Sequence, residues 1–274
     1  MDLHLAGDVA VVVGGARGIG LAVAAGFLAE GARVVILDRD AEAPTEARRL
    51  EGALGTACVG QVVDATDFDS IRRAADDVWD WFGRCDHVVY AAGVGSGKFG
   101  FPFWKLDPDD WDRVLRVNLI GAANVSHAFA PRMAEAKAGT LLFVASVAGQ
   151  IGSQTDPPYS ASKAGLINFA QCAAKDLAPF GVRVNSVCPG MIKTALNRSV
   201  YEAWAGRQGQ GEAGGYPIPS YDEWAGAKVK ALVPLGRWQT PQDVAAMAVF
   251  LASRAAGNVT GQTINVDGGY VMHW

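Results

Sequence analysis

Short runs of apolar, mostly β-branched residues alternate along the chain with longer stretches whose apolar residues recur every three or four positions. The short runs have the length of buried strands, and the longer stretches have the periodicity of amphipathic helices. The pattern predicts seven strands, at Val9–Val13, Arg33–Leu37, Ala57–Val62, His87–Tyr90, Thr140–Ala145, Arg183–Val187 and Thr263–Val266. Helices are predicted between them, among them Ile19–Glu30, Ser70–Phe82, Asp109–Ala136, Ser160–Leu177 and Pro241–Ala252.

Strands that alternate with helices are typical of an α/β fold, a doubly wound parallel sheet covered on both faces. No linker or change of composition divides the chain, so we expect one domain spanning residues 1–274. One segment, at about 195–233, departs from the alternation because it is rich in glycine, proline and aromatic residues. We expect it to be an irregular insertion that folds as a lid over a binding site.

Composition and charge narrow the classes of partner. The net charge of −4 argues against nucleic acid or an anionic membrane surface as the main partner. No apolar run approaches the roughly 20 residues of a membrane span, and the first residues lack the features of a signal peptide, so we expect a cytoplasmic protein. The cysteines are scattered and the histidines show no ligand-like grouping, which favours buried thiols and no metal site.

A glycine-rich turn, Gly14–Gly20, lies between the first strand and the first helix. Such glycines let the backbone approach a pyrophosphate, and the helix N-terminus offers free N–H groups to it. Asp38 ends the next strand, where a carboxylate would bind the ribose 2′-hydroxyl of NAD and repel the 2′-phosphate of NADP. Arg17 and Arg39 could pair with that phosphate, so NADP remains the less favoured alternative. Asp64 has two open interpretations, an adenine contact or a helix cap ahead of Asp67.

The candidate catalytic residues are Ser146, Tyr159 and Lys163. Tyr159 and Lys163 lie four residues apart and therefore share one helix face. A free phenol has a pKa of about 10, and we expect Lys163 and a positively charged nicotinamide to lower it enough for Tyr159 to act as a base. Ser146 would orient the oxygen of an alcohol or carbonyl substrate.

With these motifs in order, the chain resembles the short-chain dehydrogenase/reductase family from about Leu5 to Tyr270. The resemblance implies a Rossmann-type fold, NAD(P)-dependent chemistry at a CH–OH group, and a homotetramer. It assigns Asn118 to hold a water that connects Lys163 to solvent. Val13 and Tyr90 depart from the family's usual threonine and asparagine, which leaves the rigidity of the glycine loop open.

The resemblance and the residue pattern together define a predicted cofactor site at the ends of the strands. Its members are Gly14, Arg17, Gly18, Ile19, Gly20, Asp38, Arg39, Asp64, Ala65, Tyr90, Ala92, Gly93, Tyr159, Lys163, Pro189, Gly190, Ile192 and Thr194. Among these, Thr194 is implied as a contact of the nicotinamide carboxamide.

The expected substrate pocket has aromatic walls with scattered polar groups, which suits a polyol, a sugar or a cyclic alcohol. Its candidate contacts are Gln150, Gln154, Tyr159, Met191, Tyr201, Trp204 and Arg207. The segment Pro189–Thr194 followed by a long lid is similar to polyol and diol dehydrogenases of the family. The alternatives are an NADPH-dependent carbonyl or 3-oxoacyl reductase and a non-catalytic dinucleotide-binding protein, and the intact catalytic residues argue against the last.

Overall fold

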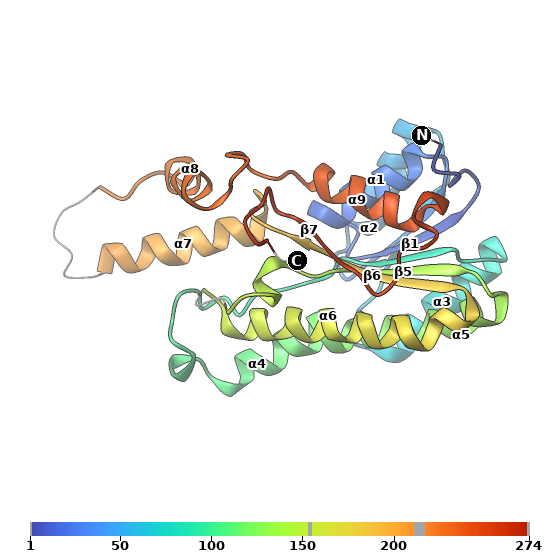
Figure 1. The fold of residues 1–274 in the computed structure, drawn as a ribbon, viewed down its shortest axis with the longest axis horizontal. Helices are drawn as coiled ribbons and strands as arrows, with labels where there is room; N and C mark the ends of the chain where they lie inside the picture. The colour runs from blue at the N-terminus through green and yellow to red at the C-terminus, as the bar shows by residue number, and fades with distance from the viewer. Residues whose placement is uncertain (1, 153–154, 211–216, 273–274) are drawn as a thin grey trace.

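A seven-stranded sheet forms the centre of the computed structural model, which describes residues 2–152, 155–210 and 217–272 (Figure 1). Every pairing is parallel, in the order β3-β2-β1-β4-β5-β6-β7. The strands are β1 (Val9–Val13), β2 (Arg33–Asp38), β3 (Cys58–Val62), β4 (His87–Tyr90), β5 (Gly139–Val144), β6 (Val182–Pro189) and β7 (Thr263–Val266). The predicted doubly wound fold is confirmed, and the strand order reverses between β1 and β4.

Helices cover both faces of the sheet, as Figure 1 shows. Val9, Val11 and Val13 of β1 pack against one helical layer, and Ala10 and Val12 pack against the other, as the alternation of side chains along a strand requires. The first layer contains α3 (Phe68–Phe82), α4 (Pro108–Leu115), α5 (Gly121–Ala136) and α6 (Pro157–Leu177); the second contains α1 (Gly18–Ala29), α2 (Ala43–Leu54) and α9 (Pro241–Ala252).

The helix predicted over Asp109–Ala136 is not one regular α-helix. A π-helical turn, Arg116–Ile120, joins α4 to α5. This wider turn carries Asn118, whose side chain is fully buried. Single π-helical turns inside α-helices occur frequently at functional sites, because the inserted residue re-aims the side chains beside it.

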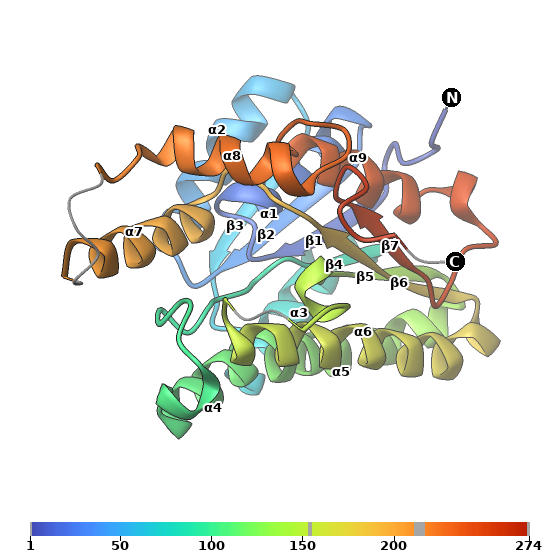
Figure 2. The ribbon, with the colours of Figure 1, turned by 60° about the vertical axis from the view of Figure 1, so that its left-hand side comes forward.

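The prediction of an irregular segment over about 195–233 is wrong for the described residues. The segment forms two helices, α7 (Ala195–Gln210) and α8 (Tyr221–Leu232), which lie side by side in Figures 1 and 2. The α8 helix begins with a capping box between Ser220 and Glu223. The segment folds as helices because its aromatic residues bury one another. These are Tyr201, Trp204, Tyr221 and Trp224, whose ring centroids lie 5.4 to 6.3 Å apart.

Candidate active site

An elongated cavity of about 1100 Å³ lies at the carboxyl ends of the strands, where the order of the sheet reverses. This is the place where open α/β sheets bind their ligands. Asp38, Arg39 and Asp64 line one end of the cavity. Ser146 and Tyr159 line the other end, and the first turns of α7 form part of the wall there.

The glycine loop packs so closely that side chains are excluded from it. A Cβ atom at Gly14, which has a φ of +80°, would lie 2.5 Å from the backbone nitrogen of Ala92. A Cβ atom at Gly20 would meet the carbonyl oxygen of Gly14. The Gly14 N–H also donates to the Leu37 carbonyl at 2.7 Å. These backbone contacts hold the loop, although Val13 and Tyr90 replace the family's usual polar pair. The resulting cradle at the start of α1 fits a pyrophosphate.

The Asp38 carboxylate is held in place by two backbone amides. Oδ2 accepts from Ala16 N at 3.0 Å, and Oδ1 accepts from Asp40 N at 3.0 Å. Arg39 also lines the cavity, and the Arg17 guanidinium lies 3.7 Å from the Asp40 carboxylate. A fixed carboxylate therefore faces this end of the cavity, with two cations nearby.

Asp64 and Asp67 have different roles. The side chain of Asp67 caps α3 by accepting from the backbone of Asp69 and Ser70. Asp64 accepts from the Thr66 N–H and hydroxyl, both at 2.8 Å, and lines the cavity together with Ala65. The cap is thus provided by Asp67, while Asp64 lies where the sequence pattern places an adenine contact.

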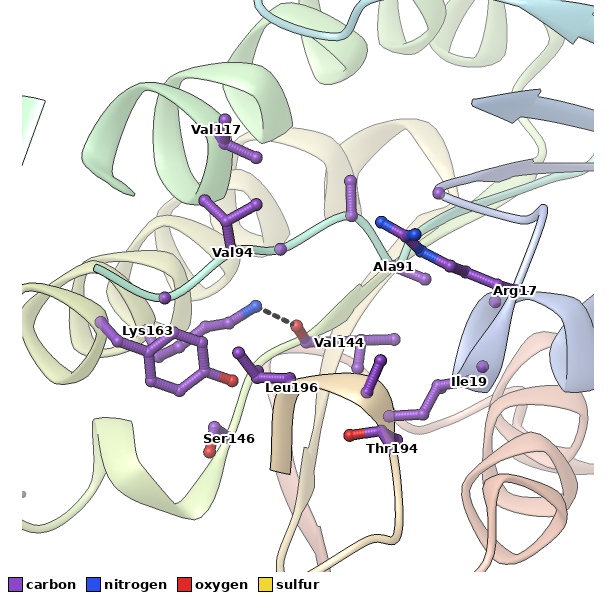
Figure 3. A pocket seen from close by; sticks show the side chains of 18 of the residues that line it. Arg17, Ile19, Ala91, Val94, Val117, Val144, Ser146, Lys163, Thr194 and Leu196 are labelled. Carbon is purple, nitrogen blue, oxygen red and sulfur yellow. Dashed lines mark hydrogen bonds between the residues drawn. The ribbon is translucent and has the colours of Figure 1, made fainter. Parts of the chain in front are cut away.

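Lys163 is buried and Tyr159 is half-buried at the deep end of the cavity. Lys163 Nζ donates to the Val144 carbonyl at 2.7 Å, as Figure 3 shows, and lies 5.7 Å from the centroid of the Tyr159 ring. Burial lowers the pKa of Lys163 to about 8. Burial also raises the pKa of Tyr159 to about 12, against the hydrogen bond from the Ser146 hydroxyl, which lowers it. Among the protein's own groups burial dominates, and the ammonium is directed at Val144, so the expectation that Lys163 and the nicotinamide together lower the pKa of Tyr159 stays a prediction.

Asn118 lies next to this pair, and its side chain makes three hydrogen bonds. Its Oδ1 accepts from Val94 N at 2.8 Å, and its Nδ2 donates to Val94 O at 3.0 Å and to Ser162 Oγ at 2.8 Å. A Cβ atom at Gly93 would lie 3.3 Å from Lys163 Nζ and 3.6 Å from Asn118 Oδ1. The absence of a side chain at Gly93 therefore lets Asn118 and Lys163 approach the same stretch of backbone.

Most of the predicted cofactor residues line the cavity, and Arg17, Ile19, Lys163 and Thr194 are labelled among them in Figure 3. Tyr90 does not, and its assignment as a cofactor contact is corrected. Its side chain is completely buried, and its hydroxyl donates to the Val117 carbonyl at 2.5 Å. The members that line the cavity are Gly14, Arg17, Gly18, Ile19, Gly20, Asp38, Arg39, Asp64, Ala65, Ala92, Gly93, Tyr159, Lys163, Pro189, Gly190, Ile192 and Thr194.

Most of the predicted substrate contacts do not line the cavity. Apart from Tyr159, the described ones, Gln150, Met191, Tyr201, Trp204 and Arg207, are not among the residues that line the cavity, and Gln154 lies outside the described residues. Gln150 exchanges hydrogen bonds with Asn265, at 2.7 and 3.0 Å. Tyr201 and Trp204 face the aromatic core between α7 and α8.

Arg207, at the far end of α7, connects the helix to the other side of the site. Its guanidinium hydrogen-bonds the Phe99 carbonyl and lies 4.8 Å from the centroid of the Phe101 ring. The α7 residues that line the cavity are instead Ala195, Leu196, Asn197, Ser199 and Val200. They directly follow Thr194, a predicted cofactor contact, and this closeness in sequence is the signal that could have identified them.

Within the described ranges, no group of three metal-ligating side chains comes together. In the same part of the chain no helix is long and apolar enough to cross a membrane. All four cysteines are free thiols, and Cys172 alone among them is exposed.

A Rossmann-type sheet with a glycine loop, a carboxylate at the end of β2 and a serine, tyrosine and lysine at the deep end defines a nicotinamide-dependent oxidoreductase. Comparison with known proteins supports this class. Residues 8–204 match the family model described as short chain dehydrogenase, and residues 215–271 match one described as enoyl-(acyl carrier protein) reductase. The chain belongs to the short-chain dehydrogenase/reductase family, whose members include dehydrogenases acting on CH–OH groups.

Relatives cover nearly the whole chain. It is 36% identical over 272 residues to a D-threitol dehydrogenase of Mycolicibacterium smegmatis, covering 99% of this chain and 95% of that protein. It is 34% identical over 273 residues to the 3-oxoacyl-(acyl-carrier-protein) reductase FabG of Thermotoga maritima, covering 98% and 100%. The crystal structure of L-sorbose reductase from Gluconobacter frateurii, complexed with NADPH and L-sorbose, superposes with a TM-score of 0.88 at 26% identity over the full length of both chains.

Proposed function

We propose that the protein is an NAD-dependent dehydrogenase that oxidises a secondary alcohol of a polyol, sugar or cyclic alcohol. The observation that carries this proposal is the continuity of one cavity between Asp38 and the group formed by Ser146, Tyr159 and Lys163. The first end selects the nucleotide, and the second handles the proton of the substrate.

The residues present fit a dinucleotide along this cavity, because the loop at Gly14 and Gly20 leaves room for phosphates and not for side chains. A bound nicotinamide would supply the hydride acceptor and, in its oxidised form, a positive charge. Pro189, Gly190 and Thr194 would hold that half of the cofactor.

The proton is handled by the chain's own groups. Ser146 holds the alcohol oxygen, and the Tyr159 phenolate removes the hydroxyl proton as the carbon–hydrogen bond is broken. Lys163, close to Asn118 at Gly93, then provides a route by which the proton leaves Tyr159. In the direction of carbonyl reduction the same phenol donates its proton to the carbonyl oxygen.

The ionisation of Tyr159 sets the direction of the pH dependence. Burial raises its pKa to about 12, so the protein's own groups keep the phenol protonated at neutral pH. Alcohol oxidation requires the phenolate and should therefore rise with pH, whereas carbonyl reduction requires the phenol and should fall. A positive charge close to the phenol moves both profiles to lower pH.

The deep end of the cavity is partly apolar and partly polar. Val94, Phe99 and Leu196 provide apolar walls, and Asn197 and Ser199 provide hydrogen-bonding groups. Such a mixture suits a molecule with several hydroxyl groups on a short carbon skeleton. The similarity to a D-threitol dehydrogenase and to an L-sorbose reductase supports the same substrate class.

A second candidate is an NADPH-dependent 3-oxoacyl reductase, which the similarity to FabG favours. Asp38 argues against it, because a fixed carboxylate repels a 2′-phosphate. Screening polyols, sugars, cyclic alcohols and a 3-oxoacyl thioester with NAD(H) and NADP(H) separates the two. Turnover of the thioester with NADPH and of no alcohol would overturn the proposal.

Asp38→Asn should shift the cofactor preference toward NADP⁺, raising the ratio of kcat/KM for NADP⁺ to that for NAD⁺ at least about tenfold, equivalent to about 1.4 kcal/mol. The amide keeps an acceptor oxygen for only one of the two backbone N–H groups, of Ala16 or of Asp40, and it removes the charge that repels the phosphate. Asp80→Asn, an exposed change on α3, is the control and should leave the ratio unchanged. An unaltered ratio in Asp38→Asn would show that Asp38 does not select the nucleotide.

We also propose a homotetramer, on the family resemblance, and light scattering of the purified protein would measure its mass.

A further inference from the structure

Asp156 is a buried carboxylate three residues before Tyr159, at the residue that precedes α6. It is 4% exposed. Its Oδ2 accepts from the Ser96 N–H at 2.9 Å, while its Oδ1 is buried without a hydrogen-bond partner among the described residues. Burying a carboxylate is unfavourable unless it is paired or fully hydrogen-bonded, so an incompletely satisfied one beside an active site calls for a functional reason.

The peptide unit that Asp156 binds is held by an opposite charge at its other end. Arg113 Nη2 donates to the Gly95 carbonyl at 2.9 Å and to the Ser96 carbonyl at 2.8 Å. The Gly95 carbonyl and the Ser96 N–H belong to one peptide group, so a guanidinium and a carboxylate align its dipole from both sides. A Cβ atom at Gly95 would lie 2.7 Å from Asp156 Oδ2, so the clamp requires glycine there.

This clamp joins the wall of the cavity to the helix that carries Tyr159. Gly95 and Arg113 line the cavity. Pro157 and Pro158 occupy the first turn of α6 and have no N–H, so the first free amide of the helix is that of Tyr159 itself. The carboxylate that holds Ser96 therefore also lies at the positive end of α6, beside Tyr159.

We propose that Asp156 is a positioning residue of the active site: with Arg113 it fixes the Gly95–Ser96 peptide against α6, and its negative charge acts on the Tyr159 phenol. This proposal rests on the proposed function, in which Tyr159 exchanges the substrate proton. It assigns to Asp156 a role in setting the pH range of each reaction direction.

The charges around both groups fit this role. Burial raises the pKa of Asp156, and Ser96, the Tyr159 amide and Arg113 oppose that rise. Burial is the main cause that raises the pKa of Tyr159, followed by the charges of Asp156 and Cys188, while the Ser146 hydroxyl opposes them. Lys163, on the same helix, lies 5.7 Å from the ring centroid. A charged Asp156 thus favours the protonated phenol, the form that delivers a proton to a carbonyl.

Asp156→Asn removes the charge and keeps an acceptor for Ser96. We expect the acid limb of the kcat/KM profile for alcohol oxidation to move to lower pH by about one unit. Asp176→Asn, the same change at the exposed far end of α6, is the matched control and should not move the limb. A profile for Asp156→Asn that coincides with the wild type would overturn the proposal, because a merely structural role predicts no shift.

A second measurement needs no substrate. Because the folded-state pKa of Asp156 is raised, its contribution to stability is present at acid pH and is lost as pH rises through that pKa. The Tm of the wild type minus that of Asp156→Asn should therefore fall as the pH rises above about 4, the ordinary pKa of an aspartate. A Tm difference that does not change with pH would show that Asp156 carries no buried charge, and it would overturn the proposal for Asp156. This result does not depend on activity. A wild type that oxidises no alcohol would overturn the proposed function separately.

Discussion

Replacing Tyr159 with phenylalanine should lower kcat for alcohol oxidation by about 10³-fold and leave the Kd for NADH within about twofold. Proton transfer by a positioned side chain typically contributes 10²- to about 10⁴-fold to a rate, and no second phenol lines the cavity among the described residues to replace it. Phenylalanine fills nearly the same half-buried space, so the fold and the nucleotide site should be preserved. Steady-state kinetics and quenching of protein fluorescence by NADH measure the two quantities.

The matched control is Tyr270→Phe, the same loss of one hydroxyl at a half-buried tyrosine that packs against the core and does not line the cavity. It should keep wild-type kcat. If Tyr159→Phe retained more than about a tenth of wild-type kcat at every pH, the assignment of Tyr159 as the acid–base group would be wrong. A loss of NADH binding in Tyr159→Phe would instead indicate a disturbed cofactor site.

The parts of the site that could be predicted from sequence are those defined by local spacing. Gly14–Gly20 follows a strand and opens a helix, and Tyr159 and Lys163 share a helix face, so their geometry depends on a few neighbouring residues. Asp38 could be placed because the end of a parallel strand always lies at the ligand-binding edge.

The remaining errors concern side chains whose direction depends on distant residues. Tyr90 ends β4 as expected, but its ring enters the core, where its hydroxyl donates a hydrogen bond to the Val117 carbonyl of the π-helical turn. No local pattern in the sequence indicates that turn. Likewise, the balance between burial and Lys163 at the Tyr159 phenol depends on how deeply the packed structure encloses both groups.

The α7–α8 segment shows how composition can mislead. Its glycines and prolines suggest a loop, whereas Tyr201 and Trp224 stabilise two helices by packing against each other. The aromatic side chains expected to contact substrate are thereby used for folding. Val200 and Asn197, less conspicuous in the sequence, face the cavity instead. Asn197 Oδ1 accepts from the Tyr221 hydroxyl at 2.9 Å, so the aromatic core of this segment also orients a cavity residue.

Gly14→Ala should reduce the free energy of unfolding by about 3 kcal/mol and weaken NADH binding at least about 100-fold. The φ of +80° is strained for alanine, and its methyl group would lie 2.5 to 2.9 Å from backbone atoms of Ala91 and Ala92, which cannot rotate away as a side chain can. The loop must then shift away from β4, and the cradle for the pyrophosphate is lost. Denaturant unfolding and NADH titration measure the two effects.

Gly18→Ala separates strain from the clash, because Gly18 has a φ of +57° in the same loop but nothing within 4 Å of an added Cβ. It should destabilise the protein by only about 1 kcal/mol. Gly52→Ala, on α2 with open space around it, should be neutral or stabilising by up to about 1 kcal/mol. If Gly14→Ala bound NADH as tightly as the wild type, the close approach of Gly14 to Ala92 would not be what shapes the nucleotide site, and the phosphates would have to be held elsewhere in the cavity.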